Sequence, residues 1–389
     1  MHALVRLVIA LGLLVVIVPA LLAQGEDPQI GKLIEQLGDD EYDVRKAAEK
    51  KLNELSEKAL EPLRKAAREH LDADVRLRAI VLSRAIEKSH FGEIRVFRGH
   101  TGHVRDIALS RDGKRLLSGS MDYTARLWEV DTGKELSKFT GHTNWAWAVA
   151  FTPDEKLALS SGALDKTARL WGFDGKEVRK FEGLAGRAYG TDITPDGKVI
   201  ALGGADTDTT IRMYDAATAK ELRKLEGHTG WVWRVKFSPD GKKLASVGCN
   251  DRSFRIWDAE SGKPLVIGAN AHDGFVIGLS FSPDGKTLLT SGRDLTCRLW
   301  DVETGKLLRK YTGVADHVEA VAFSPDGKRF LAGETRLVHV FDVETGKIVH
   351  RFEEHTDQVM AVAWTPDGKR ALSAGADNTV RLWGVPTAK

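Results

Sequence analysis

The stretch GHTGWVWRVKFSPDGKKLASVGCNDRSFRIWD, residues 227–258, decides the fold of this chain. It opens with a Gly-His pair and continues as an alternating strand up to a turn at Pro239-Asp240-Gly241. Proline presets the backbone of such a turn and glycine takes the left-handed conformation that closes it, so the turn joins two antiparallel strands. A third strand follows Asp251 and ends on Arg255-Ile256-Trp257. One such unit has open edges and needs neighbours that cover them.

The same unit recurs seven times, at intervals of about 42 to 44 residues. Gly-His or a variant of it opens units at residues 99–100, 141–142, 227–228, 271–272 and 354–355. The other six turns lie at residues 110–113, 152–155, 194–197, 282–285, 324–327 and 365–368. A hairpin repeated at this period predicts the blades of a β-propeller, and seven hairpins predict seven blades.

Each unit also ends on a strand with an aromatic signature. With the Gly-His pairs and the turns, these strands closely resemble the WD40 family over about three-quarters of the chain. The resemblance implies a mainly β protein, with a closed seven-bladed WD40 β-propeller over residues 91–389 that is a binding platform and not an enzyme. The signature strands are Arg126-Leu127-Trp128, Arg169-Leu170-Trp171, Arg212-Met213-Tyr214, Arg255-Ile256-Trp257, Arg298-Leu299-Trp300, His339-Val340-Phe341 and Arg381-Leu382-Trp383.

The phase of the repeat predicts how the ring closes. The seventh unit stops after its third strand, and an isolated strand, residues 93–97, precedes the first Gly-His. Pairing the two would remove two exposed edges. We therefore expect residues 94–97 to be the outer strand of the last blade.

In the WD40 family a His, a Ser or Thr, an Asp and a Trp form a buried hydrogen-bond network that braces each blade, and the resemblance implies the same here. A complete network stiffens a sheet because every buried polar group finds a partner. The bracing residues expected are His100, Ser118, Asp122 and Trp128 in blade 1; His142, Ser161, Asp165 and Trp171 in blade 2; His228, Asp251 and Trp257 in blade 4; His272, Thr290, Asp294 and Trp300 in blade 5; and His355, Ser373, Asp377 and Trp383 in blade 7.

Three blades depart from this pattern. In blade 4, Val247 stands where the hydroxyl is expected and Ser246 lies one position away. Blades 3 and 6 lack the His and the Trp, and we expect apolar packing alone to hold them, so that they open more easily. The residues that stand there instead are Leu184 and Tyr214 in blade 3, and Val314, Thr335 and Phe341 in blade 6.

On a WD40 propeller the innermost strand of each blade begins at the rim of one face, where the family carries partner contacts. Alternation places the third and fifth residues after each His on the same side of that strand. The partner-binding residues expected are His103, Arg105, Trp145, Trp147, Arg187, Tyr189, Trp231, Trp233, Phe275, Ile277, His317 and Met360.

The aromatic members of this set lie in blades 2 to 5. So much exposed aromatic area is unusual without a use, and Trp, Tyr and Arg dominate interface hot spots. An alternative stays open: the second Trp of each pair, Trp147 and Trp233, packs into the channel as core.

Other classes of function find little support in the sequence. There is no His-Glu-x-x-His, Gly-x-Ser-x-Gly, phosphate loop or zinc-spaced Cys pair, so we expect no catalytic residue, no metal and no cofactor. A formal charge of +2 gives no basic footprint for nucleic acid. Cys249 and Cys297 are expected to be buried and unpaired.

The N-terminus carries a separate signal. A basic start and an uncharged apolar run, residues 7–23, precede Ala23-Gln24-Gly25. Residues 1–25 are therefore expected to be a signal peptide, or else a retained membrane anchor, and the folded part to be exported to the periplasm or the cell exterior.

Residues 26–90 show helical periodicity with breaks near residues 38–40, 56 and 71–72, where Asp or Ser is placed to cap the next helix. The phrase Asp43-Val44-Arg45 recurs as Asp74-Val75-Arg76, and this resembles the second helix of a HEAT repeat. A helical spacer and a small docking surface are both open interpretations of this segment.

Three functions follow from these observations. The first is a non-catalytic protein-interaction scaffold of a bacterial cell envelope, with a monomeric propeller that grips a protein partner on its aromatic rim. The second is a small-molecule or sugar-binding, lactonase-like propeller, which the scarcity of acidic rim residues disfavours. The third is a structural subunit of an envelope assembly, which would need permanent partners. Fold alone does not decide between them.

Overall fold

The computed structural model describes residues 27–386, and the chain divides into two compact units, Met1–Glu87 and Lys88–Lys389. The described helices are α1 (Pro28–Glu35), the 3-10 turn η1 (Gln36–Gly38), α2 (Tyr42–Leu55), α3 (Glu57–Glu69) and α4 (Ala73–Phe91). The helical segment predicted from the periodicity is thus confirmed. The expected signal peptide or anchor, residues 1–25, lies outside the described residues.

The breaks between these helices are only partly as expected. Asp27 caps α1 by accepting from the Gln29 N–H at 2.9 Å, and Asp72 accepts from the Asp74 N–H at 2.7 Å at the start of α4. Ser56 does not cap α3: its backbone is left-handed, with φ of 52°, and its hydroxyl donates back to the Asn53 carbonyl. Ser56 therefore ends α2: its backbone N–H donates to the Leu52 and Asn53 carbonyls of the last turn.

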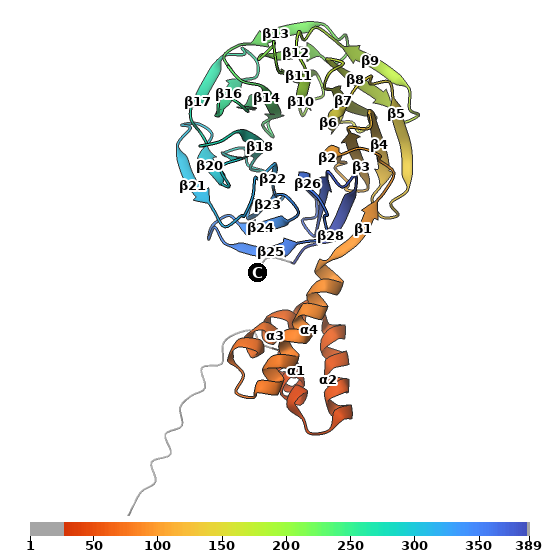
Figure 1. Ribbon diagram of the computed structural model, residues 1–389, viewed down its shortest axis with the longest axis vertical. Helices are drawn as coiled ribbons and strands as arrows, with labels where there is room; N and C mark the ends of the chain where they lie inside the picture. The colour runs from red at the N-terminus through yellow and green to blue at the C-terminus, as the bar shows by residue number, and fades with distance from the viewer. Residues whose placement is uncertain (1–26, 387–389) are drawn as a thin grey trace, which may run out of the picture. The chain divides into compact units, whose positions relative to one another are not determined.

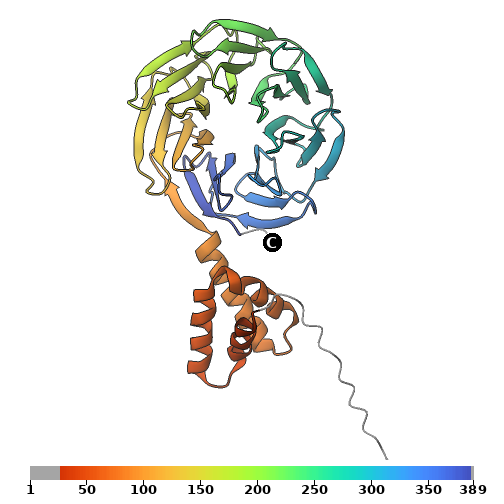
Figure 2. The same cartoon turned by 180° about the vertical axis from the view of Figure 1, so that it is seen from behind.

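The second unit is a ring of seven four-stranded antiparallel sheets around a central channel (Figures 1 and 2). Each sheet is one blade, and its strands run from the channel outward. The prediction of a seven-bladed propeller is confirmed. The strands are β2 (Val104–Leu109), β3 (Arg115–Ser120), β4 (Thr124–Glu129) and β5 (Glu135–Thr140) in blade 1; β6 (Ala146–Phe151), β7 (Leu157–Gly162), β8 (Thr167–Gly172) and β9 (Glu177–Phe181) in blade 2; β10 (Ala188–Ile193), β11 (Val199–Gly204), β12 (Ile211–Asp215) and β13 (Glu221–Leu225) in blade 3; β14 (Val232–Phe237), β15 (Lys243–Gly248), β16 (Ser253–Asp258) and β17 (Pro264–Gly268) in blade 4; β18 (Val276–Phe281), β19 (Thr287–Gly292), β20 (Cys297–Asp301) and β21 (Leu307–Tyr311) in blade 5; β22 (Ala320–Phe323), β23 (Arg329–Gly333), β24 (Val338–Asp342) and β25 (Ile348–Phe352) in blade 6; and β26 (Val359–Trp364), β27 (Arg370–Gly375), β28 (Val380–Gly384) and β1 (Glu93–Phe97) in blade 7.

Strand β1 closes the ring, as the repeat phase predicts. It pairs antiparallel with β28, with Phe97 opposite Val380 and Glu93 opposite Trp383. Phe97 is buried, and the Arg381 guanidinium bonds the Glu93 carboxylate. Blade 7 is therefore built from the two ends of the propeller sequence (Figure 1).

The turns between the first and second strands follow the predicted chemistry with one exception. Glycine occupies the left-handed position in six blades, for example Gly113 with φ of 69° and Gly241 with φ of 72°. Blade 2 has Glu155 there, with φ of 54°, a conformation that costs a residue with a Cβ roughly 1 kcal/mol. The Glu155 carboxylate lies 3.0 Å from Arg115 of blade 1 and also accepts from the Arg111 N–H, so the strained residue ties two turns together.

Burial falls from the channel to the circumference. The second strands, such as β3 and β7, are buried along nearly their whole length because neighbouring blades cover both of their faces. The outer strands have two outward residues exposed and an aromatic or aliphatic residue buried at or near the end, as in β9. The apolar core lies between adjacent blades; one cluster joins Leu159 and Phe181 of blade 2 to Ile200 and Tyr214 of blade 3.

Candidate functional site

A network of four side chains braces blade 1. His100 Nδ1 lies 2.8 Å from Asp122 Oδ2, and His100 Nε2 lies 2.7 Å from Ser118 Oγ. Trp128 Nε1 donates to the same hydroxyl at 2.8 Å. Because the carboxylate accepts, Nδ1 of the histidine carries the proton and the Ser118 hydroxyl donates to Nε2. Every polar atom of the set thus has a partner within the blade.

Four more blades contain the same network. In each, the histidine reaches a hydroxyl at 2.7 or 2.8 Å and the indole donates to that hydroxyl at 2.8 Å. The members are His142, Ser160, Asp165 and Trp171; His228, Ser246, Asp251 and Trp257; His272, Thr290, Asp294 and Trp300; and His355, Ser373, Asp377 and Trp383.

Two of the sequence assignments were wrong by one residue. The hydroxyl in blade 2 is that of Ser160, not Ser161, and in blade 4 it is that of Ser246, so Val247 does not interrupt the network. The hydroxyl lies 18 residues after the histidine in all five blades, whereas the Asp lies 23 residues after it in blades 2 and 4 and 22 in the others. The extra residue lies between the hydroxyl and the Asp. Counting four residues back from the Asp therefore selects the residue after the true hydroxyl in these two blades. The side chain of that residue points to the other face of the sheet.

Ser161 has a different partner. Its hydroxyl donates to the Tyr189 carbonyl of blade 3 at 2.8 Å. Ser291 of blade 5 makes the equivalent bond to the Val318 carbonyl of blade 6 at 2.9 Å. These two hydroxyls join neighbouring blades, whereas those of the bracing network act within one blade.

The electrostatics of the network favour a structural role over catalysis. Burial lowers the pKa of His100 and of His272, so both imidazoles stay neutral near pH 7. Burial opposes ionisation of Asp122, but hydrogen bonds from His100, Thr124 and the Thr101 N–H outweigh it and hold the pKa of this carboxyl well below its usual range. The Ser118 hydroxyl, which would be the nucleophile of a catalytic triad, is buried and already accepts a hydrogen bond from the Trp128 indole N–H. Such a set braces a sheet but offers no access to a substrate.

Blades 3 and 6 are not held by apolar packing alone, contrary to the expectation. In blade 3 the buried Asp208 accepts from the Ala185 N–H at 3.0 Å and from Thr210, and hydrogen bonds hold its pKa below the usual value despite burial. In blade 6 Glu334 accepts from the Ala315 N–H at 3.0 Å and lies 3.0 Å from His339 Nε2. A buried carboxylate is thus kept in both blades although the His and the Trp are lost.

The predicted rim residues lie in two layers. The third residue after each His lies just before the innermost strand and is exposed or half-buried, as for His103, Trp145, Arg187 and Trp231. The fifth residue points into the channel. Four such residues, expected at an exposed rim, are instead buried in the structure: Trp147, Tyr189, Ile277 and Met360.

The aromatic residues of blades 2, 3 and 4 form one cluster. The rings of Trp147 and Tyr189 lie 4.4 Å apart, and those of Tyr189 and Trp233 lie 4.9 Å apart. Trp145 lies 6.0 Å from Trp147, and Trp231 lies 6.5 Å from Trp233 with the two rings nearly parallel. The alternative left open in the sequence thus holds for Trp147, whereas Trp233 is half-buried. Trp145 and Trp231 are half-buried as well, and both pack against the buried part of the cluster.

The remaining predicted rim residues flank the cluster. Arg187 donates to the Tyr189 hydroxyl at 2.9 Å and pairs with Asp206 at 2.8 Å. Phe275 is 39% exposed and lies beneath the Arg293 guanidinium. His103 is exposed, and the His317 side chain is 41% exposed. We call Trp145, Arg187, Trp231, Trp233 and Phe275 the aromatic arc.

A polar pair that sequence reasoning missed crosses the channel below this layer. Arg234 of blade 4 donates to Asp106 of blade 1 at 3.1 Å and to the Met360 carbonyl of blade 7 at 3.0 Å. Arg105 stacks on Trp147 at 3.9 Å, and burial lowers its pKa to about 10, so it remains charged at neutral pH. Asp106 and Arg234 both stand six residues after the His, where other blades have glycine or alanine, such as Gly190 and Ala148. That exchange of a small residue for a charged one is the signal that could have revealed them.

The cavity left among these side chains measures about 10 Å³ and is bordered by Arg105, Trp147, Trp233 and Arg234. One water molecule needs about that much space. The hollow bordered by these four side chains is therefore too small for a ligand.

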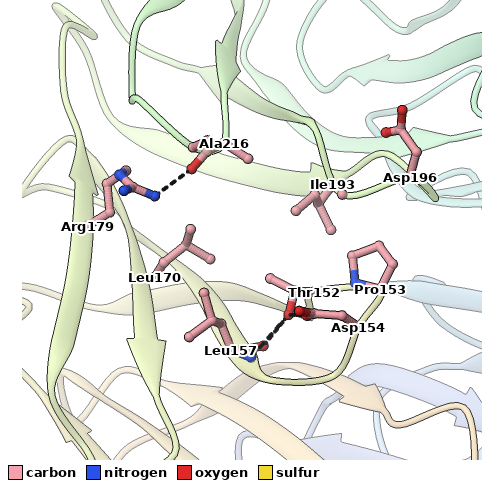
Figure 3. Close-up of a pocket in the computed structure, with 11 residues that line it drawn as sticks. Thr152, Pro153, Asp154, Leu157, Leu170, Arg179, Ile193, Asp196 and Ala216 are labelled. Carbon is pink, nitrogen blue, oxygen red and sulfur yellow. Dashed lines mark hydrogen bonds between the residues drawn. The ribbon is translucent and has the colours of Figure 1, made fainter.

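Larger hollows lie on the opposite face, between the Pro-Asp-Gly turns of adjacent blades. Figure 3 shows the one between blades 2 and 3, about 300 Å³, where Leu170 and Ile193 line the wall and Arg179 donates to the Ala216 carbonyl at 2.8 Å. Similar hollows separate blades 3 and 4 and blades 4 and 5. Since the hollow repeats with the blades, it follows from the wedge between them and not from a dedicated ligand site.

Within residues 27–386, no group of three His, Cys, Asp or Glu side chains is placed to hold a metal ion. Cys249 and Cys297 are free and buried, and burial raises the pKa of Cys249 to about 12. In the same range no helix is long and apolar enough to cross a membrane.

A closed ring of seven antiparallel blades, five of them braced by the same buried hydrogen-bond network, defines a repeat protein of the β-propeller class. The family model "WD domain, G-beta repeat" matches residues 91–129, 133–172, 219–258, 263–301, 305–342 and 346–384, so the chain belongs to the WD40 family. The matched ranges leave out residues 173–218, which contain Leu184 and Tyr214 of blade 3. WD40 propellers typically serve as protein-interaction scaffolds and are generally non-catalytic.

Similar curated proteins match over short stretches. The chain is 44% identical over 62 residues to nuclear distribution protein nudF 2 of Penicillium rubens, covering 15% of this chain and 13% of that protein. It is 33% identical over 69 residues to guanine nucleotide-binding protein subunit beta-1 of Caenorhabditis briggsae, covering 17% and 20%. It is 42% identical over 57 residues to human WD repeat and SOCS box-containing protein 1, covering 14% of each chain. The matches thus span at most one fifth of these relatives' length.

Proposed function

We propose that this protein is a non-catalytic scaffold that holds a protein partner against the aromatic arc. The observation that carries the proposal is that Trp145, Trp231 and Trp233 are only partly buried while they pack against the buried rings of Trp147 and Tyr189. Trp145 rests on Trp147, and Trp231 lies nearly parallel to Trp233. Large rings held in place lose little conformational freedom when a partner binds. Trp and Arg are also the residues that most often dominate binding energy.

The geometry of the channel supports this proposal over a small-molecule site at the channel mouth. The Arg234–Asp106 pair and the stacked Arg105 and Trp147 fill the space that such a ligand would need. A ligand pocket normally encloses several hundred Å³.

The proposed setting is the cell envelope, outside the cytoplasm. The support is the sequence of residues 1–25, with its basic start, its apolar run and the small residues at Ala23-Gln24-Gly25. N-terminal sequencing of the protein recovered from its native cells tests this. A new terminus near residue 25 in an envelope or secreted fraction supports export, and a cytoplasmic protein that keeps Met1 would contradict it.

Crosslinking and affinity purification from native cells test the aromatic arc. The double variant Trp145→Ala, Trp231→Ala should lose the partner while its melting temperature stays within about 2 °C of wild type, because neither ring is fully buried. Leu136→Ala is the matched control: Leu136 is 43% exposed but lies on outer strand β5, away from the arc. Capture that survives the double variant, or is lost equally in the control, would contradict the proposal.

A further inference from the structure

The outer strands of the seven blades repeat one pattern of side chains. The second residue of each is an exposed aliphatic, such as Leu136, Val178 and Leu222. In five blades an exposed basic residue follows two positions later, on the same outward side of the strand. These five residues are Lys138, Lys180, Lys224, Lys310 and Arg351.

Such basic residues protect an edge strand. The outermost strand of a sheet presents unpaired N–H and C=O groups to any other extended chain. A lysine beside them must lose its water when a second strand approaches, and this makes edge pairing unfavourable. The five basic residues thus keep the circumference of the propeller from pairing.

Strand β17 of blade 4 keeps the exposed aliphatic at its second residue, Leu265, but has no basic residue two positions later. It reads Pro264-Leu265-Val266-Ile267-Gly268 and carries no charge. Ile267 stands where five other blades have Lys or Arg, and it lies opposite Arg255 on β16. Leu265 and Ile267 are 52% and 54% exposed, and β17 lies on the outer circumference of the ring (Figure 1).

Packing within the blade accounts for some of these changes but not for Ile267. Gly268 stands where most of the other outer strands end on a buried aromatic residue, and a Cβ there would lie 2.1 Å from the Phe254 ring. Phe254 of β16 takes over the aromatic role, with its ring 4.9 Å from that of Trp300 in the next blade. Val266 points inward against the turn at Gly305 of blade 5. Leu265 and Ile267 point outward, where a lysine would fit equally well.

Blade 7 shows how an outer strand without the basic residue is otherwise protected. Its strand β1 has Val96 at that position, but Val96 is only half-exposed. The charged residues Glu93 and Arg95 lie on either side of Ile94 in the same strand. Strand β17 has neither kind of protection.

We propose that the β17 edge, Pro264–Gly268, pairs with the β17 edge of a second copy of this chain. In an antiparallel pair centred on Val266, Leu265 of one copy stands opposite Ile267 of the other, so both outward pairs are aliphatic. The same arrangement on β13 would set Lys224 against Leu222, so the ammonium group, now paired with Glu226 at 2.9 Å in water, would have to lose its hydration beside an aliphatic side chain. The uncharged edge is therefore complementary to itself, whereas the lysine-bearing edges are not. This association is independent of the aromatic arc and replaces the monomeric propeller expected from the sequence.

The association should be weak. One five-residue strand on each side covers less than the roughly 1,200 Å² that a stable interface buries. We therefore expect a reversible dimer whose population rises with protein concentration across the range of about 10 µM to 1 mM.

Analytical ultracentrifugation of the purified full chain over this range tests the proposal. Ile267→Lys should raise the dissociation constant at least tenfold, because each copy would bury a charge opposite Leu265. Leu222→Lys is the matched control: it adds the same charge to an equally exposed aliphatic position on β13. This control should leave the association unchanged.

Hydrogen exchange locates the contact. The amides of residues 265–268 should gain protection as the concentration rises in wild type but not in Ile267→Lys. A wild type that stays monomeric up to about 1 mM overturns the proposal. So does an association that survives Ile267→Lys, or a β17 edge that gains protection only when an extended segment of a different protein binds it.

Discussion

Replacing Ser246 by alanine removes the hydroxyl that joins His228 to Trp257 in blade 4. That hydroxyl lies 2.7 Å from His228 Nε2 and accepts from Trp257 Nε1 at 2.8 Å, and Ser246 is fully buried. Alanine fits the same space, so the variant should fold. It leaves an indole N–H and an imidazole nitrogen without a partner in the interior of the blade.

The size of the effect follows from these two groups. A buried polar group that loses its partner costs about 1–3 kcal/mol. With two groups affected, the free energy of unfolding should fall by about 2–6 kcal/mol. At about 2–4 °C per kcal/mol, the melting temperature should fall by about 4–24 °C.

Thermal and urea unfolding of Ser246→Ala and Ser246→Thr provide the measurement. Threonine is the matched control because Thr290 holds this place in blade 5, with both of its hydrogen bonds at 2.8 Å. Ser246→Thr keeps the hydroxyl and should lose much less stability than Ser246→Ala. Exchange of the Trp257 indole proton, followed by NMR, gives a local readout and should accelerate only in the alanine variant.

Either of two results would refute this reasoning. One is an alanine variant that melts within about 1 °C of wild type. The other is an unchanged exchange rate of the Trp257 indole proton in that variant. Either result would mean that the Ser246 hydroxyl does not bridge His228 and Trp257.

Three further outcomes are expected. Glu155→Gly should be more stable than Glu155→Ala by about 1 kcal/mol in urea unfolding, because both lose the Arg115 contact but only glycine relieves the left-handed backbone; equal stabilities would count against strain at this turn. Since burial lowers the pKa of His100 and His272 below the unfolded value of about 6.5, the unfolded chain takes up protons there that the folded chain does not. Stability should therefore fall as the pH drops below about 6.5, by at most about 1.4 kcal/mol per pH unit for each histidine, and a urea midpoint that stays flat between pH 7.5 and 5.5 would contradict this. Deleting residues 91–98 should abolish the cooperative melting transition by leaving β28 unpaired, and a sharp transition in the deletion variant would argue against ring closure by β1.

The repeats made the fold predictable from the sequence. Proline, aspartate and glycine in the turns act locally, so each turn could be assigned without knowledge of the rest of the chain. Ring closure was predictable for a different reason: the strand at residues 93–97 and the short seventh unit each lacked a partner.

The bracing networks show where counting along the chain fails. Blades 2 and 4 have one extra residue between the hydroxyl and the Asp, which is Asp165 or Asp251. The sequence alone does not show whether this extra residue comes before or after the hydroxyl. Counting forward from His142 and His228 gives the correct hydroxyl, because the first hairpin has the same length in every braced blade.

The channel was the least predictable part. Whether Trp147 and Trp233 face water depends on what six other blades place at the same depth, and no local pattern reports that. The hydrogen bond from Arg234 to Asp106 joins residues that are 128 positions apart, on blades 4 and 1, which are not consecutive in the chain. Contacts of this kind depend on the diameter of the ring and the volumes of all the side chains within it.

The pairing of β1 with β28 also constrains the order in which the propeller can fold. Glu93 and Arg381 are 288 residues apart, so at about 5–20 residues per second a ribosome needs roughly 15–60 s between making the two strands. During that time β1 waits without its partner while the first six blades can assemble one after another. Closing so long a loop is entropically costly and slow, so the last step of folding comes after synthesis of the propeller is complete. Until then the nascent chain has two unpaired strand edges, and a chaperone that shields them would act at this stage and no other.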